Sequence, residues 1–90
     1  MEILKDLQTR LKPVEKIETE IDSGMLYIKM GATTVCCYFR ADESIIKGHV
    51  RVGWFLLPKD IRDEILGNIR LTCMRFKIKS DCENLERENP

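Results

Sequence analysis

The sequence lacks long apolar runs and an excess of charge of either sign. No apolar run approaches the roughly 20 residues that a membrane-spanning helix needs, and the first residues mix charges into apolar positions, which is not typical of a secretory signal. The 15 basic and 15 acidic residues cancel, which argues against a protein whose main role is to coat nucleic acid. We therefore expect a cytoplasmic protein without a membrane segment.

Histidine and closely spaced cysteine pairs are also scarce. His49 is the only histidine, and the four cysteines include no C-x-x-C pair. Cys36 and Cys37 are adjacent, so on a strand their thiols would point to opposite faces, whereas a structural zinc site needs four convergent ligands. No glycine-rich phosphate loop, S-x-x-K sequence or metal triad occurs. We expect reduced cysteines, no metal, no cofactor and no catalytic site.

The length and the charge distribution indicate one domain with a tail. A chain of 90 residues is long enough for one hydrophobic core and too short for two. Residues 80–90 contain one leucine among several, mostly acidic, charges. We expect a single domain over residues 1–79 and a disordered acidic tail over residues 80–90.

Two segments have the apolar spacing of amphipathic helices. The first, residues 2–12, ends at Pro13, because proline disfavours helical geometry in the residue before it. The second opens at Pro58 and places acidic residues early and basic residues late, as the helix dipole favours. An alternative ends that helix near Gly67 and makes residues 69–78 a fifth strand. We favour the long helix.

Four segments between the helices alternate apolar and polar residues with the period of β-strands. They are residues 16–22, 25–30, 33–40 and 49–57. The first two connections are short and contain glycine, which suits two-residue hairpin turns at positions 23–24 and 31–32. The third, residues 41–48, is longer and polar. This arrangement predicts the cross-strand pairs Ile21–Leu26, Leu26–Cys37, Phe39–Val50 and Val35–Trp54.

All four strands then share one apolar face, on which both helices can pack. The sequence therefore predicts an α+β fold with two layers. A four-stranded antiparallel meander carries the N-terminal and C-terminal helices on one face, in the order α-β-β-β-β-α.

The opposite face of the predicted sheet carries aromatic and basic residues. One hypothesis is a platform for single-stranded nucleic acid, in which bases stack on the rings and basic groups contact the phosphates. Its candidate residues are Tyr27, Lys29, Tyr38, Arg40 and Arg51. The acidic residues of the first strand and the zero net charge instead favour an ordinary exposed face.

The two edges of the predicted meander differ in charge. The first strand carries four charged residues, whereas the last, residues 48–57, carries only Arg51 and ends in four consecutive apolar residues. An apolar edge is either covered by another segment or paired with a partner. Pairing with a second copy would give a homodimer through strand 48–57.

These observations predict a small non-catalytic regulatory protein or inhibitor, of a size that a mobile genetic element would encode. It would bind a macromolecule, preferably a protein, through the last strand and the adjoining sheet face, with nucleic acid as the alternative partner. Aromatic and arginine residues are the usual anchors of such surfaces. The candidate contact residues are Tyr38, Arg40, His49, Arg51, Trp54 and Phe55.

Overall fold

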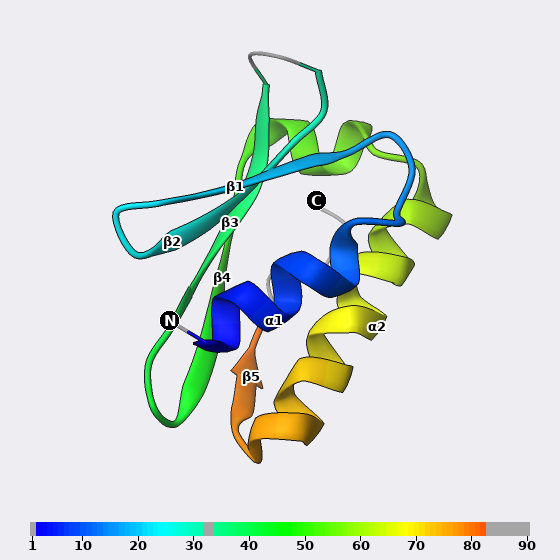
Figure 1. Ribbon diagram of the computed structural model, residues 1–90. Helices are drawn as coiled ribbons and strands as arrows, with labels where there is room; N and C mark the ends of the chain where they lie inside the picture. The colour runs from blue at the N-terminus through cyan, green and yellow to red at the C-terminus, as the bar shows by residue number, and fades with distance from the viewer. Residues whose placement is uncertain (1, 32–33, 83–90) are drawn as a thin grey trace.

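The computed structural model describes residues 2–31 and 34–82, which form an α+β fold. The elements, in chain order, are α1 (Glu2–Leu11), β1 (Glu18–Asp22), β2 (Met25–Lys29), β3 (Val35–Ala41), β4 (Ile45–Val50), the 3₁₀ helix η1 (Val52–Leu56), α2 (Lys59–Phe76) and β5 (Lys79–Asp81). Strands β1 to β4 form an antiparallel meander, and β5 pairs with β4 in parallel (Figure 1). The predicted meander with a helix before and after it is confirmed.

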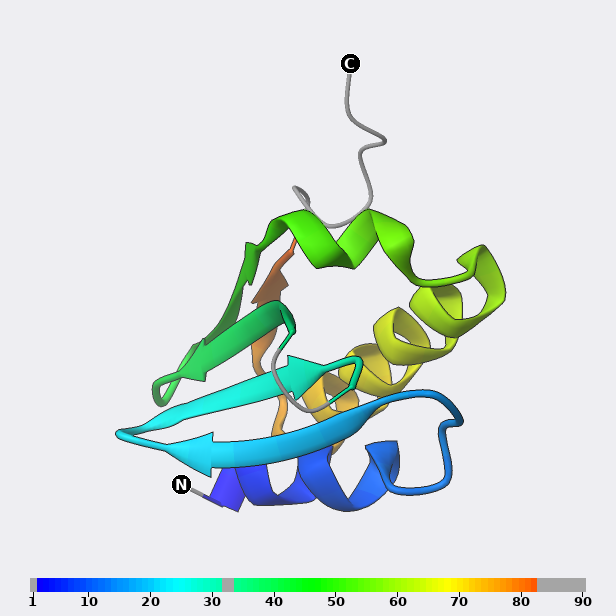
Figure 2. The same ribbon diagram turned by 90° about the horizontal axis from the view of Figure 1, so that it is seen from above.

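The two helices supply much of the core. The buried residues of α1 are Leu4, Leu7 and Leu11, and those of α2 include Ile61, Ile65, Ile69 and Cys73. Figure 2 shows the sheet opposite α2, with η1 closing one side of the interior. Because α2 continues to Phe76, the alternative strand at residues 69–78 is wrong. Lys77 ends the helix in the left-handed conformation (φ 57°), and its N–H donates to the Cys73 carbonyl.

The first hairpin has the predicted register. Ile21 pairs with Leu26, and the turn residues Ser23 and Gly24 both have positive φ, 52° and 77°. Two successive residues with positive φ are typical of the tight turn whose twist matches antiparallel strands.

The predicted register is wrong at the next two hairpins, by two residues each time. Leu26 pairs with Phe39 instead of Cys37, and Phe39 pairs with Gly48 instead of Val50. Side chains alternate with period two along a strand, so a shift of two residues keeps side chains on their predicted faces wherever the pairing is regular. The exception is a bulge in the β2–β3 ladder after Ile28, where Lys29 pairs with Val35. The apolar face is therefore confirmed although the pairs are not.

The second shift arises at the turn between β3 and β4. The Oδ1 atom of Asp42 accepts hydrogen bonds from the backbone N–H groups of Ser44 (2.8 Å) and Ile45 (3.1 Å) and from the Ser44 hydroxyl (3.1 Å). Aspartate stabilises such turns by bonding to the backbone two residues on. The hairpin closes early as a result, and β4 begins at Ile45 rather than at residue 49.

The predicted last strand is wrong beyond Val50, because the chain turns into η1. The Trp54 N–H donates to the Arg51 carbonyl (3.0 Å), and the Leu57 N–H donates to the Trp54 carbonyl (3.2 Å). These bonds span three residues, as in a 3₁₀ helix. They direct Trp54 and Leu57 into the core, where they are 0% and 2% exposed.

Close packing of η1 against β3 makes Gly53 a test of this geometry. A Cβ atom at Gly53 would lie 3.0 Å from Thr34 Cγ2 and 3.4 Å from Cys36 Sγ, whereas one at Gly67 in α2 would meet nothing within 4 Å. We expect Gly53→Ala to lower the free energy of unfolding by about 1 kcal/mol or more through crowding. Gly67→Ala should raise it by about 0.5–1 kcal/mol. Urea denaturation of both variants measures the difference, and equal effects would contradict the packing of η1.

The segment expected to form a disordered tail begins inside the fold. Ser80 and Asp81 belong to β5, and Cys82 is 7% exposed. The Lys79 N–H donates to the Ser44 carbonyl (3.0 Å), which attaches β5 to the start of β4. The rest of the predicted tail, residues 83–90, lies outside the described residues.

Candidate functional site on the outer face of the sheet

Three aromatic side chains lie in one row on the outer face, the face of the sheet opposite the core. Tyr27 of β2, Tyr38 of β3 and His49 of β4 are paired across the strands. The ring centroids of Tyr27 and Tyr38 are 5.5 Å apart, and those of Tyr38 and His49 are 4.8 Å apart with nearly parallel planes. All three side chains are half-buried. We call Tyr27, Tyr38 and His49 the aromatic row.

Arg51 completes this cluster from the end of β4. Its guanidinium carbon lies 5.4 Å from the centroid of the Tyr38 ring, and the residue is exposed. Its backbone N–H donates to the Cys36 carbonyl (2.8 Å), so the position of Arg51 relative to β3 is set by the last bond of the ladder. An arginine over an aromatic face is stabilised by the ring quadrupole.

The imidazole of His49 has one polar atom without a partner. Its Nε2 atom is buried and makes no hydrogen bond within the described part of the chain. Buried polar atoms in folded proteins are nearly always hydrogen-bonded. The described residues therefore leave this nitrogen of His49 without a hydrogen bond.

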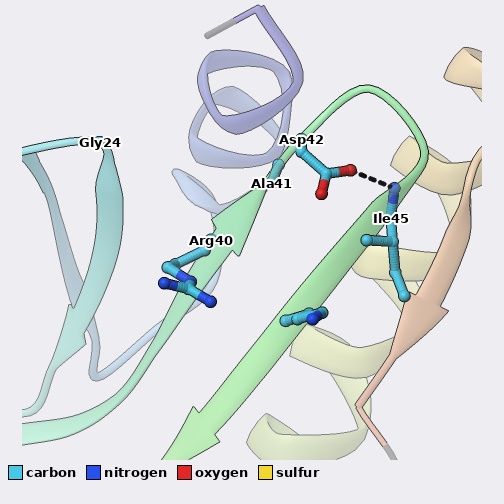
Figure 3. A pocket seen from close by; sticks show the side chains of 6 residues that line it. Gly24, Arg40, Ala41, Asp42 and Ile45 are labelled. Atoms are coloured by element: carbon cyan, nitrogen blue, oxygen red, sulfur yellow. Dashed lines mark hydrogen bonds between the residues drawn. The ribbon is translucent and has the colours of Figure 1, made fainter.

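A second row, directly beside the aromatic row, is basic. Arg40 of β3 pairs with Lys47 of β4, and both side chains are exposed. They line a cavity of about 240 Å³ at the end of the β3–β4 hairpin (Figure 3). The other lining residues are Gly24, Ala41, Asp42 and Ile45. The sequence interpretation missed Lys47, because it placed that residue in a loop before the strand.

The β1 side of the outer face is acidic. Glu18, Glu20 and Asp22 share this face, and Glu20 accepts a hydrogen bond from Lys29 Nζ at 2.6 Å. This hydrogen bond raises the pKa of Lys29. Lys29 is thus occupied by an intramolecular partner, whereas Arg40, Lys47 and Arg51 make no ion pair within the described residues. The outer face has an acidic side and a basic side.

Two of the six candidate contact residues, Trp54 and Phe55, lie in η1 instead of the predicted strand. Trp54 is 0% exposed and belongs to the core, so it cannot anchor a partner. Phe55 is half-buried, with the guanidinium of Arg62 5.5 Å from its ring centroid. The exposed apolar residues of η1 are instead Val52, 89% exposed, and Leu56, 67% exposed.

The β4 edge is not the open edge that the sequence predicted. Ile45, Ile46 and Lys47 pair with β5, so the C-terminal segment covers this part of the edge. Because residues 52–56 are helical, only residues 48–50 of the predicted strand 48–57 belong to β4. Pairing through the remaining part of this edge stays a prediction, and the sheet face is the larger part of the candidate surface.

The cysteines are buried and free of disulfide bonds. Burial raises the pKa of the thiols of Cys36, Cys37 and Cys73. The protonated thiol is a weak nucleophile, so these residues act as core side chains. Within residues 2–31 and 34–82, no three histidine, cysteine or acidic side chains are grouped to hold a metal ion.

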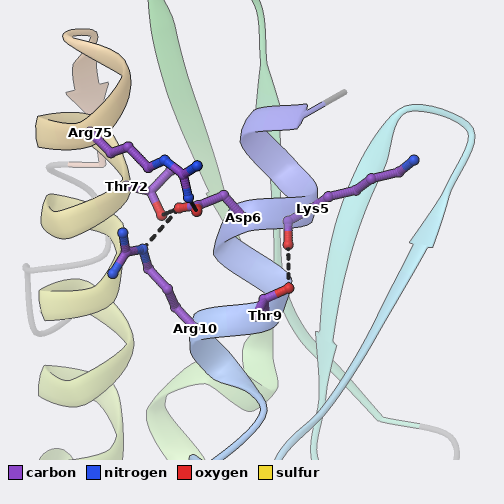
Figure 4. A network of polar contacts seen from close by, with 6 residues as sticks. All are labelled: Lys5, Asp6, Thr9, Arg10, Thr72 and Arg75. Carbon is purple, nitrogen blue, oxygen red and sulfur yellow. Dashed lines mark hydrogen bonds and ion pairs between the residues drawn. The ribbon is translucent and has the colours of Figure 1, made fainter.

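One further polar cluster joins the two helices. Asp6 of α1, whose side chain is 9% exposed, accepts hydrogen bonds from Arg10 Nε (2.8 Å), the Thr72 hydroxyl (2.8 Å) and Arg75 (2.6 Å) (Figure 4). Burial alone raises the pKa of Asp6, but the hydrogen bonds from Arg10 and Thr72, with the Arg10 charge and Arg75, lower it overall. Thr72 is fully buried. This cluster holds α1 against α2.

The fold and the outer face define a small α+β protein with a polar, aromatic sheet surface. Comparisons with protein-family models, with curated protein sequences and with solved structures found no match to this chain. Neither helix in the described residues is both long and apolar enough to cross a membrane.

Proposed function

We propose that the protein is a non-catalytic interaction protein that binds an acidic protein partner through the aromatic row and Arg51. The observation that carries this proposal is the continuous contact from Tyr27 through Tyr38 to His49 and Arg51, on the face opposite the core. Tyrosine and arginine are enriched among the residues that dominate binding energy at protein interfaces.

The order within the aromatic row favours binding. Rings that already contact each other lose little conformational freedom when a partner covers them, so less of the interaction energy is spent on ordering. The basic side of the face, with Arg40, Lys47 and Arg51, complements a partner with acidic side chains. Val52, which directly follows Arg51, adds exposed apolar surface at its end.

The same geometry gives less support to a stacking platform for nucleic acid. A base needs an open ring face, but one face of Tyr38 is covered by His49, and Tyr27 and Arg51 also lie against its ring. Lys29, a candidate phosphate contact, is paired with Glu20. The acidic residues of β1 would repel a phosphate backbone that crossed the whole face.

Charge reversal at Arg51 tests the proposal. We expect Arg51→Glu to abolish capture of the acidic partner from an extract of the native host, while Lys12→Glu, at an exposed position just after α1, leaves capture unchanged. Both changes alter the net charge equally, so a difference in capture between the two variants reflects where the charge lies on the surface. Capture that survives Arg51→Glu, or that Lys12→Glu reduces equally, would contradict the proposal.

Two further measurements separate the other occupants of this face. The first is binding of a single-stranded oligonucleotide at low salt. If its affinity falls steeply with added salt and with Tyr38→Ala, the partner is nucleic acid and not a protein. Light scattering that shows a dimer dissociated by Arg51→Glu would identify the partner as a second copy. The proposal predicts a monomer and no oligonucleotide binding.

A further inference from the structure

We infer that the cavity between Arg40, Lys47 and Gly24 is a binding site for a phosphate monoester. The inference rests on the proposed function only for its source, because the partner that covers the aromatic row would present the phosphate as a phosphorylated side chain. Arg40 and Lys47 lie two residues from Tyr38 and His49 on the same face, so one partner can contact both rows.

The two cations of the cavity make no ion pair within the described residues, although Asp81 is opposite Lys47 in the β4–β5 ladder and the charge of Lys47 helps to lower the pKa of Asp42. Arg40 and Lys47 are directly opposite each other in the β3–β4 ladder, and neither makes an ion pair or side-chain hydrogen bond within residues 2–31 and 34–82. Like charges directly opposite each other on a sheet are destabilising. A bound anion would offset this repulsion.

The one carboxylate of the cavity is already occupied. Asp42 uses its Oδ1 atom for three hydrogen bonds within the turn, and the backbone N–H and hydroxyl of Ser44 lower its pKa. Figure 3 shows this carboxylate directed toward Ile45. It keeps its charge, so the cavity has two positive charges and one negative charge.

The chemistry of the pair fits a phosphate monoester. Arginine presents a planar fork that binds two oxygens, and lysine adds a compact charge for a third. A phosphate monoester carries a charge of about −1.5 to −2 and three acceptor oxygens at pH 7, whereas a carboxylate would satisfy Arg40 alone. The volume of about 240 Å³ lies below the usual 300–1,000 Å³ of small-molecule sites, which fits one charged group rather than a whole cofactor.

A titration with inorganic phosphate, followed by amide chemical shifts at constant ionic strength, tests the site. We expect saturable shifts at residues lining the cavity, and binding at least about tenfold weaker in Arg40→Gln and in Lys47→Gln. Lys12→Gln, which removes a lysine outside the cavity, should bind as the unmodified protein does. Absence of saturable shifts, or equal weakening by Lys12→Gln, would overturn the inference.

Asp42→Asn is expected to strengthen phosphate binding, whereas Arg40→Gln and Lys47→Gln weaken it. Asparagine also stabilises this kind of turn, so the hairpin is kept while the negative charge is lost, and phosphate should bind more tightly. Weaker phosphate binding by Asp42→Asn, with unfolding unchanged, would contradict the charge argument.

The source of the phosphate is decided with a phosphoserine peptide. Tighter binding of the peptide than of inorganic phosphate assigns the site to a phosphorylated protein, and equal binding assigns it to a small phosphate compound. The inference and the proposed function fail separately. If Arg51→Glu abolishes partner capture but the protein binds no phosphate, the proposed function stands and the phosphate site does not. If the protein binds phosphate but Arg51→Glu leaves partner capture unchanged, the phosphate site stands and the proposed function does not.

Discussion

Trp54→Ala is expected to lower the free energy of unfolding by about 3–5 kcal/mol, as truncation of a buried large aromatic side chain usually does. Trp54 is the largest fully buried side chain, and η1 holds it in the core next to Leu57. Small domains have a total stability of about 5–15 kcal/mol. The variant would therefore lose a large fraction of its stability.

Leu56→Ala is the matched control for Trp54→Ala. Leu56 lies in the same 3₁₀ helix and is 67% exposed, so its truncation should change the free energy of unfolding by less than about 0.5 kcal/mol. Urea denaturation at pH 7 measures both variants. Large and similar losses in both variants would instead favour the strand predicted from the sequence, in which alternation directs Trp54 and Leu56 to the same, core-facing side.

Asp6→Ala is expected to lower the free energy of unfolding by about 2–3 kcal/mol, because it removes a charged acceptor and leaves the buried Thr72 hydroxyl without its partner. Arg10 and Arg75 are 30% and 63% exposed, so water can solvate them once Asp6 is gone. Asp63→Ala removes an exposed ion pair with Lys59 and should cost less than about 1 kcal/mol. Equal losses in the two variants would contradict the role of Asp6.

The contribution of Asp6 should also depend on pH. Its pKa in the folded state is lower than the ordinary value of 3.8, so the folded state favours the carboxylate. The added stability is then complete above pH 3.8 and is lost as the pH falls through the folded pKa. We expect the difference in unfolding free energy between the unmodified protein and Asp6→Asn to narrow below pH 4. A difference that stays constant down to pH 2 would contradict the lowered pKa.

The sequence predicted the faces of the strands better than their partners. Leu26, Cys37 and Phe39 face the core as alternation requires, because alternation depends only on position along a strand. Pairing also depends on turn geometry, and the third turn is set by hydrogen bonds to the Asp42 side chain. The residues Asp42-Glu43-Ser44 carry that signal, and reading them as a turn would have started β4 at Ile45.

The candidate site was likewise predicted only in part, because alternation gives the face of a residue but not where a strand ends. Tyr38, His49 and Arg51 were predicted to share a surface, and the structure brings them together with Tyr27. Trp54 was assigned to a strand because a short apolar run fits a strand and a helix equally well. Only the bonds at residues 51–57 distinguish the two, and they turn Trp54 inward while Val52 and Leu56 face solvent.

Hydroxyl-radical footprinting of the protein alone and bound to its captured partner tests the central claim most directly. The claim is that the outer face of the sheet is the binding surface. We predict that oxidation of Tyr27, Tyr38 and His49 slows on binding, while oxidation of Met74, which is 73% exposed on α2, is unchanged. Protection of Met74 with no change at the aromatic row would place the partner on the helices and contradict the proposed function.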